Sequence, residues 1–282
     1  MTLKLGIFAV PDATDPAATL ETIAAADQSG LDFVGVQDHP YQRRFFDTWT
    51  LLAYAAGRTE RVRLLPDVIN LPLRLPSVLA KSAASLDILS GGRVEIGVGA
   101  GAFWEAIEAM GGRSLTPKES VDALEEAIAI LRGFWSGERS VTVEGEHHRV
   151  KGAKPGPPPA HPIGIWVGAY GPRMLRLTGR LGDGWLPSLG GHYLSPDDVP
   201  AMQARIDEGA KRAGRDPADI ERAVNVMALE GEPDRWADEL ARIATELGFT
   251  TILVGLPDDD PVGFVRRLGE DVAPRVRELT GA

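Results

Sequence analysis

Short apolar runs alternate with longer amphipathic segments along the whole chain. Most of these runs are almost continuously apolar, a pattern typical of strands that are buried on both faces of a parallel sheet. The runs are Leu3–Val10, Phe33–Gln37, Val62–Val68, Val94–Val98, Ile163–Val167, Gly184–Pro187, Ala223–Leu229 and Thr251–Val254. Their alternation with helical segments predicts repeated βα units.

The segments between the runs carry signals for the start of a helix. A polar residue stands directly before a proline at Asp15-Pro16, Ser195-Pro196, Glu232-Pro233 and Asp260-Pro261. Proline is favoured at the first position of a helix, and Asp and Ser are good N-caps. Thr116 and Glu119 have the spacing of a capping box. These signals predict the helices that connect parallel strands.

Eight strands alternating with helices predict a (β/α)8 barrel, the TIM barrel, formed by residues 1–282 as one domain. An open doubly wound sheet is the other fold considered, but it usually has phosphate-binding glycines after its first strand, and Val10-Pro11-Asp12 has none. Ser140–Lys151 alternates apolar and polar residues and predicts a short hairpin inserted before the fifth strand. Lys154–Pro162 contains five prolines and predicts a stiff, extended connector.

The composition limits the partners of the protein. Forty acidic and 30 basic residues give a net charge of −10, which disfavours binding to nucleic acid or to anionic lipid. The chain has no cysteine, so disulfides, thiolate metal sites and a cysteine nucleophile are excluded. No apolar stretch is long enough to span a membrane, and the first apolar run is interpreted as a strand rather than a signal peptide. We expect a cytoplasmic protein that acts on a small molecule.

The candidate catalytic residues follow the second and third apolar runs. In a (β/α)8 barrel the active site lies at the carboxyl ends of the strands. Asp38 and His39 follow the second run and are the chain's only adjacent acid–imidazole pair. A histidine can donate or accept a proton near neutral pH, although His39 could also be a structural residue packed under a loop. Asp67 and Val68 end the third run, and Asn70 lies two residues beyond it.

Glycine-rich turns follow the fourth and fifth runs. Gly97–Gly101 would let a flat ring lie against the backbone. Gly168–Arg173 opens a helix, whose free N–H groups and positive dipole end suit an anion such as phosphate, and Arg173 could add further donors. Either turn could also be a plain strand–helix connection. His147-His148 lies in the predicted hairpin, where the two rings should face opposite sides, a poor geometry for a metal.

Four segments resemble the bacterial luciferase-like superfamily and occur in the same order. Phe33–His39 resembles its second-strand segment, and Leu79–Arg93 resembles its third helix and the turn that follows. Val94–Gly101 resembles its fourth strand and glycine loop, and Gly179–Trp185 resembles the stretch before its sixth strand. The continuous stretch from the third helix to the fourth strand is the most specific of these similarities.

The resemblance implies a luciferase-like (β/α)8 oxidoreductase that uses FMN or the deazaflavin coenzyme F420, with this chain closer to the F420-dependent branch. It implies that His39 is the active-site histidine beside the reactive ring. It also implies a bulge at Asp67-Val68 that holds a non-prolyl cis peptide behind that ring. The implied cofactor contacts are Asp38, Asp67, Val68, Asn70, Ala100, Gly101, Glu105, Gly168, Ala169, Tyr170, Gly171 and Arg173.

The expected function is hydride transfer between coenzyme F420 and an unidentified small organic substrate. The first alternative is an FMN-dependent monooxygenase fed by reduced flavin and O2, and the second is a non-catalytic flavin-binding relative. An unrelated barrel hydrolase or isomerase is disfavoured because the strand ends lack convergent carboxylates and metal ligands. F420-dependent glucose-6-phosphate dehydrogenases carry a catalytic glutamate directly after the fourth-strand glycine loop. Ala102 stands there in this chain, which disfavours a sugar-phosphate substrate.

Two neighbouring helices predict a homodimer. The helix Asp47–Gly57 contains Trp49 and has no charge between Asp47 and Arg58, so it should be buried on both sides. The next helix, Ser77–Leu89, mixes large apolar residues with small ones that allow another helix to approach closely. A two-fold dimer is the simplest way to cover such a patch, and the luciferase-like resemblance agrees. Coverage by the chain's own loops or hairpin is the alternative.

Overall fold

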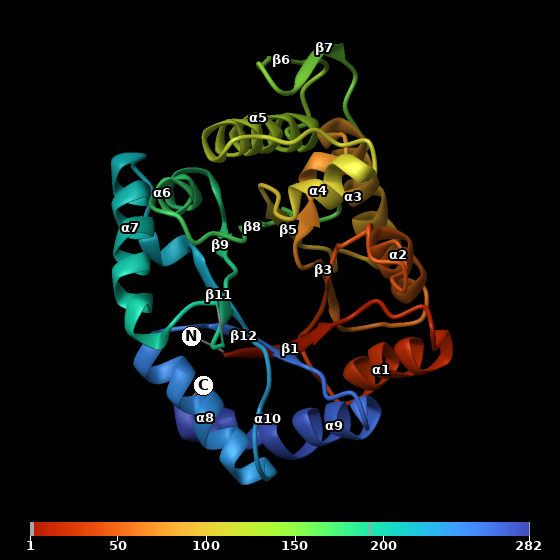
Figure 1. Ribbon diagram of the computed structural model, residues 1–282, viewed down its shortest axis with the longest axis vertical. Coiled ribbons are helices and arrows are strands. Elements are labelled where there is room, and N and C mark those ends of the chain that lie inside the picture. The colour runs from red at the N-terminus through yellow and green to blue at the C-terminus, as the bar shows by residue number, and fades with distance from the viewer. Residues whose placement is uncertain (1–2, 192, 282) are drawn as a thin grey trace.

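A parallel sheet curls into a barrel at the centre of the molecule, with helices outside it (Figure 1). The computed structural model describes residues 3–191 and 193–281. Neighbouring strands pair in the order β3-β2-β1-β12-β11-β9-β8-β5-β4, and β10 pairs with β11. The barrel strands are β1 (Lys4–Ala9), β2 (Phe33–Val36), β3 (Arg63–Pro66), β4 (Ile69–Asn70), β5 (Ile96–Gly99), β8 (Ile165–Val167), β9 (Gly184–Trp185), β10 (Ser188–Leu189), β11 (Glu221–Val226) and β12 (Thr251–Gly255).

The barrel closes between β3 and the residues just before β5. A parallel bridge joins Leu64 to Val94. Leu64 N–H donates to the carbonyl of Arg93 at 2.8 Å, and Glu95 N–H donates to the carbonyl of Leu64 at 3.0 Å. This closure confirms the predicted (β/α)8 barrel.

Two of the predicted strands are interrupted. The third apolar run gives β3, then a bulge at Asp67-Val68, then β4. The sixth gives β9 and β10, separated by Leu186-Pro187. The ten strands of the sheet within the described residues therefore occupy eight barrel positions. The predicted order of strands is confirmed, although several boundaries differ by two or three residues.

The predicted caps lie at the starts of the helices. The Asp15 and Asp260 side chains accept hydrogen bonds in the first turns of α1 and α9, and Thr116 and Glu119 form the predicted capping box of α5. The α-helices are α1 (Pro16–Gln28), α2 (Thr48–Ala56), α3 (Pro76–Ser90), α4 (Trp104–Ala109), α5 (Pro117–Trp135), α6 (Pro172–Leu181), α7 (Val199–Arg212), α8 (Pro233–Leu247), α9 (Pro261–Arg267) and α10 (Ala273–Thr280). Short 3-10 turns lie at Leu71–Leu73, Pro196–Asp198 and Pro217–Asp219, and a π-helical turn, Leu268–Val272, joins α9 to α10.

The predicted hairpin forms outside the barrel. Its strands, β6 (Val141–Glu144) and β7 (Arg149–Ala153), pair antiparallel and lie beyond α5 (Figure 1). The Glu126 carboxylate on α5 fixes the tip of the hairpin by accepting three backbone N–H bonds from residues 146–148. In the described part of the chain, no helix combines the length and the apolar character needed to cross a bilayer.

Candidate active site

His39 lies at the carboxyl end of β2, in a half-buried position at the mouth of the barrel. Its Nδ1 lies 2.7 Å from the hydroxyl of Tyr41, and the edge of the Phe103 ring packs against it with 5.8 Å between centroids. Burial lowers the pKa of His39, and the nearby Asp38 carboxylate only partly offsets this effect. The imidazole is therefore predominantly neutral at neutral pH and available for hydrogen bonding.

Asp38 is held by Arg74 rather than by its neighbour in the sequence. Both Asp38 carboxylate oxygens accept from the Arg74 guanidinium, at 2.9 and 2.8 Å, and Oδ2 also accepts from the Asn70 backbone N–H at 3.0 Å. Arg74 in turn donates to Asp47, the N-cap of α2, at 2.7 Å. These charge-assisted bonds tie the loops after β2 and β4 to the start of α2.

The bulge between β3 and β4 places the Val68 side chain among three glycines. The Asp67-Val68 peptide is cis, as predicted. A Cβ built on Gly97, Gly99 or Gly168 would meet the Val68 methyl groups at 3.0, 2.8 and 3.3 Å. Any larger residue at Gly99 would therefore collide with Val68. Gly97 and Gly99, which we expected to accommodate a flat ring, accommodate Val68, which is itself partly exposed.

The carboxyl group of Asp67 points into the barrel. Its Oδ1 accepts from the Asn225 amide of β11 at 3.0 Å, and Gly35 leaves room for Oδ2. Within the described residues, Oδ2 has no hydrogen-bond partner. Burial raises the pKa of Asp67 to about 7, although the Asn225 hydrogen bond lowers it. Asp67 is thus a buried acid within the bulge.

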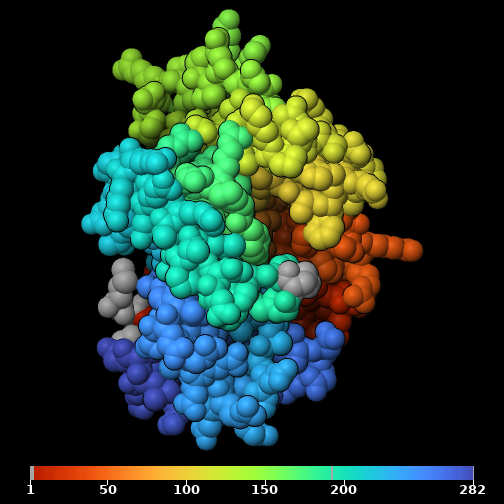
Figure 2. Space-filling view, turned by 60° about the vertical axis from the view of Figure 1, so that its left-hand side comes forward, coloured from red at the N-terminus to blue at the C-terminus, as the bar shows by residue number. Residues whose placement is uncertain are grey.

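A cleft of about 670 Å³ opens beside the bulge, between the loops after β5 and β8 and the first turns of α5 and α6. The predicted residues that line it are Ala100, Gly101, Gly168, Tyr170, Gly171 and Arg173. Figure 2 shows the surface hollowed between the yellow segment that follows β5 and the green segment around residue 170. The structure thus brings the predicted glycine loops together.

The two helices that face this cleft begin differently. Thr116 and Glu119 satisfy the first turn of α5 through the capping box. The N-cap of α6 is Gly171, and no side chain caps this helix. Its first N–H groups and the positive end of its dipole are therefore left for a ligand. The Arg173 side chain is already engaged, because it donates to Asp122 and to the carbonyl of Lys118.

The remaining predicted residues lie around the cleft in different settings. The Tyr170 hydroxyl accepts from Ser188 N–H at 2.8 Å. Ala169 is buried, and its carbonyl accepts from the Trp185 indole at 2.9 Å. Glu105 is exposed in the first turn of α4 and does not line the cleft.

Sequence reasoning missed Tyr41, Arg74, Phe103 and Asn225. Tyr41 had a weak signal, because it lies two residues beyond His39 in the same strand-end loop. Phe103 has a left-handed backbone, with φ of 58°, and its side chain is 65% exposed above His39. That conformation is unusual for a non-glycine residue and cannot be read from the local sequence.

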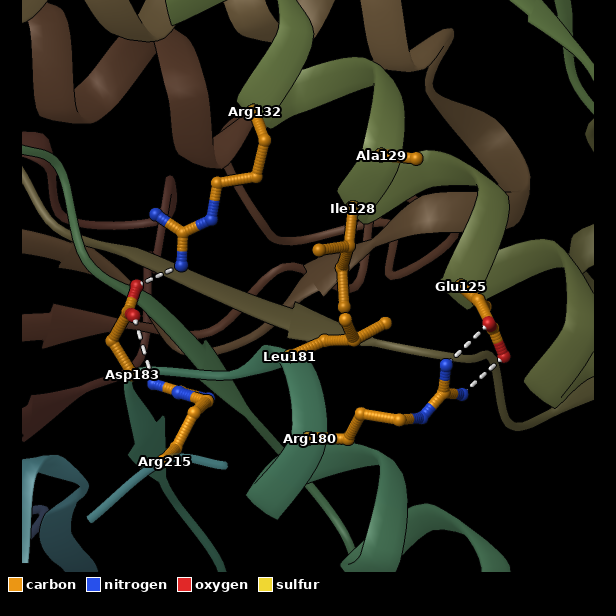
Figure 3. Close-up of a pocket in the computed structure, with 8 residues that line it drawn as sticks. All are labelled: Glu125, Ile128, Ala129, Arg132, Arg180, Leu181, Asp183 and Arg215. Atoms are coloured by element: carbon orange, nitrogen blue, oxygen red, sulfur yellow. Dashed lines mark hydrogen bonds and ion pairs between the residues drawn. The ribbon is translucent and has the colours of Figure 1, made fainter. Parts of the chain in front are cut away.

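A second cavity, of about 530 Å³, lies between α5 and α6 near the amino ends of β8 and β9 (Figure 3). Its charged residues bind one another. Arg180 forms a bidentate pair with Glu125, at 2.7 and 2.6 Å, and Arg132 and Arg215 both reach Asp183. Asp183 also accepts from the Ile165 backbone N–H at 2.8 Å. This end of a (β/α)8 barrel ordinarily provides stability, so we assign the cavity no catalytic role.

His147 and His148 lie where the sequence placed them, in the hairpin. Both lie in the turn between β6 and β7, and both line one small cavity; their backbone N–H groups donate to Glu126 on α5. In residues 3–191 and 193–281, no group of three or more His, Asp or Glu side chains is arranged to hold a metal ion.

Comparisons with known proteins agree with this architecture. A family model described as luciferase-like monooxygenase matches residues 3–257. An F420-dependent glucose-6-phosphate dehydrogenase from Intrasporangium calvum is 30% identical, over 98% of this chain and 100% of the relative. A 5,10-methylenetetrahydromethanopterin reductase from Methanolobus tindarius is 32% identical, over 91% of this chain and 73% of the relative. The structure of an F420-dependent secondary alcohol dehydrogenase in complex with an F420-acetone adduct superposes with a TM-score of 0.86, at 21% identity, over 98% and 100% of the two chains.

The chain therefore belongs to the luciferase-like monooxygenase family. This membership confirms the family predicted from the four sequence segments, and with it the prediction of an oxidoreductase.

Proposed function

We propose that this protein is an F420-dependent oxidoreductase that transfers hydride between the coenzyme and a small organic substrate at the mouth of the barrel. The observation that carries the proposal is the uncapped start of α6 at a cleft that Gly101 also lines. Phe103 links this loop to His39, because it lies two residues beyond Gly101 and packs against the His39 ring. The named activity of the Intrasporangium calvum relative supports the same cofactor.

The residues of the cleft fit a phosphorylated cofactor. Its volume lies within the usual range of about 300–1,000 Å³ for ligand sites. Gly171 leaves open space where a side chain would lie, and the first turn of α6 offers N–H donors to a phosphate. Coenzyme F420, a deazaflavin, supplies the hydride acceptor or donor when it is bound. We assign Val68 to the support of its ring, and Tyr170 and Gly171 to its phosphate.

His39 and its neighbours would act on the substrate. The imidazole is neutral and half-buried, so it can exchange a hydrogen bond with a substrate oxygen. The negative charge of Asp38 is balanced by Arg74, and rings surround His39 on two sides. Such surroundings suit an uncharged substrate. Ala102 also disfavours a sugar phosphate, because the resemblance implies a glutamate at this position in glucose-6-phosphate dehydrogenases.

The cofactor is tested by titrating the purified protein with F420 and, separately, with FMN while recording cofactor fluorescence. We expect F420 to bind at least about tenfold more tightly than FMN, and small uncharged alcohols rather than glucose 6-phosphate to reduce it. Tighter binding of FMN would favour the alternative of a flavin-dependent monooxygenase. Binding of neither cofactor would overturn the proposal.

We also propose that the protein forms a homodimer through α2 and α3. Tyr54 on α2 is 50% exposed, and Leu89 on α3 is 84% exposed. Leu75 and Val78, at the start of α3, are exposed as well and share a helical face with Leu89. Trp49 packs against the core, so Leu89→Glu is the cleaner test. Light scattering should detect a dimer that this variant dissociates. A wild-type mass near 30.2 kDa at every concentration would end the dimer proposal.

A further inference from the structure

His39 belongs to a cluster of three rings at the mouth of the barrel. The His39 and Tyr41 rings lie 5.5 Å apart, and Phe103 packs against both, at 5.8 and 6.1 Å between centroids. Tyr41 follows β2 and Phe103 follows β5, so two separate loops hold the imidazole. Such packing fixes the plane of the His39 ring but does not decide which of its nitrogens carries the proton.

The hydroxyl of Tyr41 determines which nitrogen of His39 carries the proton. Burial and the nearby Asp38 carboxylate raise the pKa of Tyr41, while a hydrogen bond with the Asn70 side chain lowers it. Tyr41 therefore remains a neutral phenol near neutral pH and can donate its proton in a hydrogen bond. Its hydroxyl lies 2.7 Å from Nδ1 of His39, the geometry of a direct hydrogen bond.

Asn70 sets the direction of this hydrogen bond. Its buried Oδ1 has no partner within the described residues, so the amide meets Tyr41 through its N–H group. The Tyr41 oxygen then accepts from Asn70, and its proton is directed to Nδ1 of His39. A neutral imidazole that accepts at Nδ1 carries its own proton at Nε2.

We propose that Tyr41 is a positioning residue that holds His39 in the Nε2–H tautomer. In this form the histidine presents a hydrogen-bond donor, rather than a base, to an oxygen of the bound substrate. Asp38 cannot play this part, because Arg74 and the Asn70 backbone N–H occupy its carboxylate. A series of hydrogen bonds from Asn70 through Tyr41 to His39 thus takes the place of the Asp38–His39 pair that the sequence suggested.

Nitrogen-15 NMR of the labelled protein without cofactor, near neutral pH, tests the tautomer directly. The His39 signals are assigned from their loss in His39→Gln. We expect wild-type His39 to carry its proton on Nε2, and Tyr41→Phe to shift it to the Nδ1–H form or to a mixture of tautomers. Tyr54→Phe, which removes the same hydroxyl from an exposed position on α2, is the matched control and should leave these signals unchanged.

A wild-type His39 in the Nδ1–H form would overturn the proposal, and so would an unchanged tautomer in Tyr41→Phe. The wild-type spectrum decides the question even if the variant folds poorly. Because no cofactor is present, this experiment does not depend on the proposed function.

The kinetic consequence does rest on the proposed function. In F420-linked turnover, Tyr41→Phe should lower kcat about tenfold, the effect of one hydrogen bond, with the Kd for F420 changed by less than about twofold. An unchanged kcat would contradict the positioning role. Absence of F420 binding in the wild type would instead remove the proposed function and leave the NMR result as the test of Tyr41.

Discussion

His39 and His161 lie at opposite ends of the same barrel and are bound in opposite ways. At the amino end, Nδ1 of His161 lies 2.7 Å from Asp87 and Nε2 lies 2.7 Å from Arg63, so both ring nitrogens have partners. At the carboxyl end, His39 has one polar partner among the described residues, the Tyr41 hydroxyl at Nδ1. The first arrangement uses all the hydrogen-bonding capacity of the ring for the fold, and the second leaves Nε2 for a ligand.

The buried polar atoms that lack a hydrogen-bond partner also distinguish the two ends of the barrel. Those without a hydrogen-bond partner in the described residues are Asp67 Oδ2, Asn70 Oδ1, His147 Nδ1, Arg222 Nη1, Asn225 Oδ1 and Trp236 Nε1. Asp67, Asn70 and Asn225 all lie at or near the carboxyl ends of barrel strands. Unpaired buried groups destabilise a fold, so their concentration at this end is consistent with a site whose polar groups are completed by a ligand.

The largest expected effect is the pH dependence that Asp67 confers on stability. Burial raises its pKa to about 7 from 3.8, so between these values the folded state holds a proton that the unfolded chain has lost. Its contribution is fully present below about pH 4 and is lost as the pH rises through 7, a total of about 4 kcal/mol. Denaturant unfolding across this range, compared with Asp67→Asn, isolates the contribution.

The comparison with Asp67→Asn is needed because other carboxylates change the stability in the opposite direction as the pH rises. Backbone hydrogen bonds from residues 60–62 outweigh burial and lower the pKa of Asp27, so its contribution grows as the pH rises through the acidic range. Asp67→Asn keeps these groups and removes only the buried acid. Parallel stability curves for the two proteins would show that Asp67 does not titrate in this range.

The second-largest effect is expected for the turnover number of His39→Ala. His39→Ala should lower kcat by about 100-fold or more, because it removes the group that hydrogen-bonds the substrate. The Kd for F420 should barely change, and the free energy of unfolding should change by about 1 kcal/mol or less. Steady-state kinetics and F420 titration measure both. If affinity collapsed while kcat persisted, His39 would be a binding residue; if neither changed, the non-catalytic alternative would be favoured.

At the other end of the barrel, His161→Ala should reduce stability and leave cofactor binding intact. Asp87 is fully buried, and the variant removes the imidazole that pairs with it, which should cost about 2 kcal/mol. Urea denaturation measures the loss. A loss of F420 affinity without a loss of stability would contradict the division between the two ends.

The smallest effect is expected in the cavity between α5 and α6. Arg180 and Glu125 are both exposed there, so Arg180→Gln should change the free energy of unfolding by about 0.5 kcal/mol at most. Turnover with F420 should be unaffected. A marked change in F420 affinity would indicate that this cavity, rather than the cleft at the carboxyl end, takes part in binding.

The barrel was predictable because each of its strands is a short apolar run bounded by turn signals. The interruption of the third strand was not visible in that pattern. Val68 and Ile69 continue the apolar run past Asp67, and only the resemblance implied a bulge there. Strand boundaries also shifted, because hydrogen bonding to neighbouring strands, rather than local apolarity, sets where β11 ends at Val226.

The candidate site was predictable in its location and not in its contacts. Strand ends are local features, so His39 and Gly171 could be identified from the sequence. Hydrogen-bond partners depend on how loops meet in space. Asp38 was paired in the sequence with His39, but the folded chain pairs it with Arg74, 36 residues away. Tyr41, which contacts His39, was overlooked because its only signal was its place in the same strand-end loop.

The central claim is that the uncapped start of α6 binds the anionic part of coenzyme F420. Gly171 has an ordinary φ of −73° and open space where a side chain would go, so it tolerates substitution. Asp and Ser are both good N-caps, but only Asp brings a negative charge. Equilibrium titration with F420 should therefore show binding to wild type and Gly171→Ser, and binding weakened at least about tenfold in Gly171→Asp, the cost of about 1.4 kcal/mol of repulsion. Equal affinities for Gly171→Ser and Gly171→Asp would contradict the account.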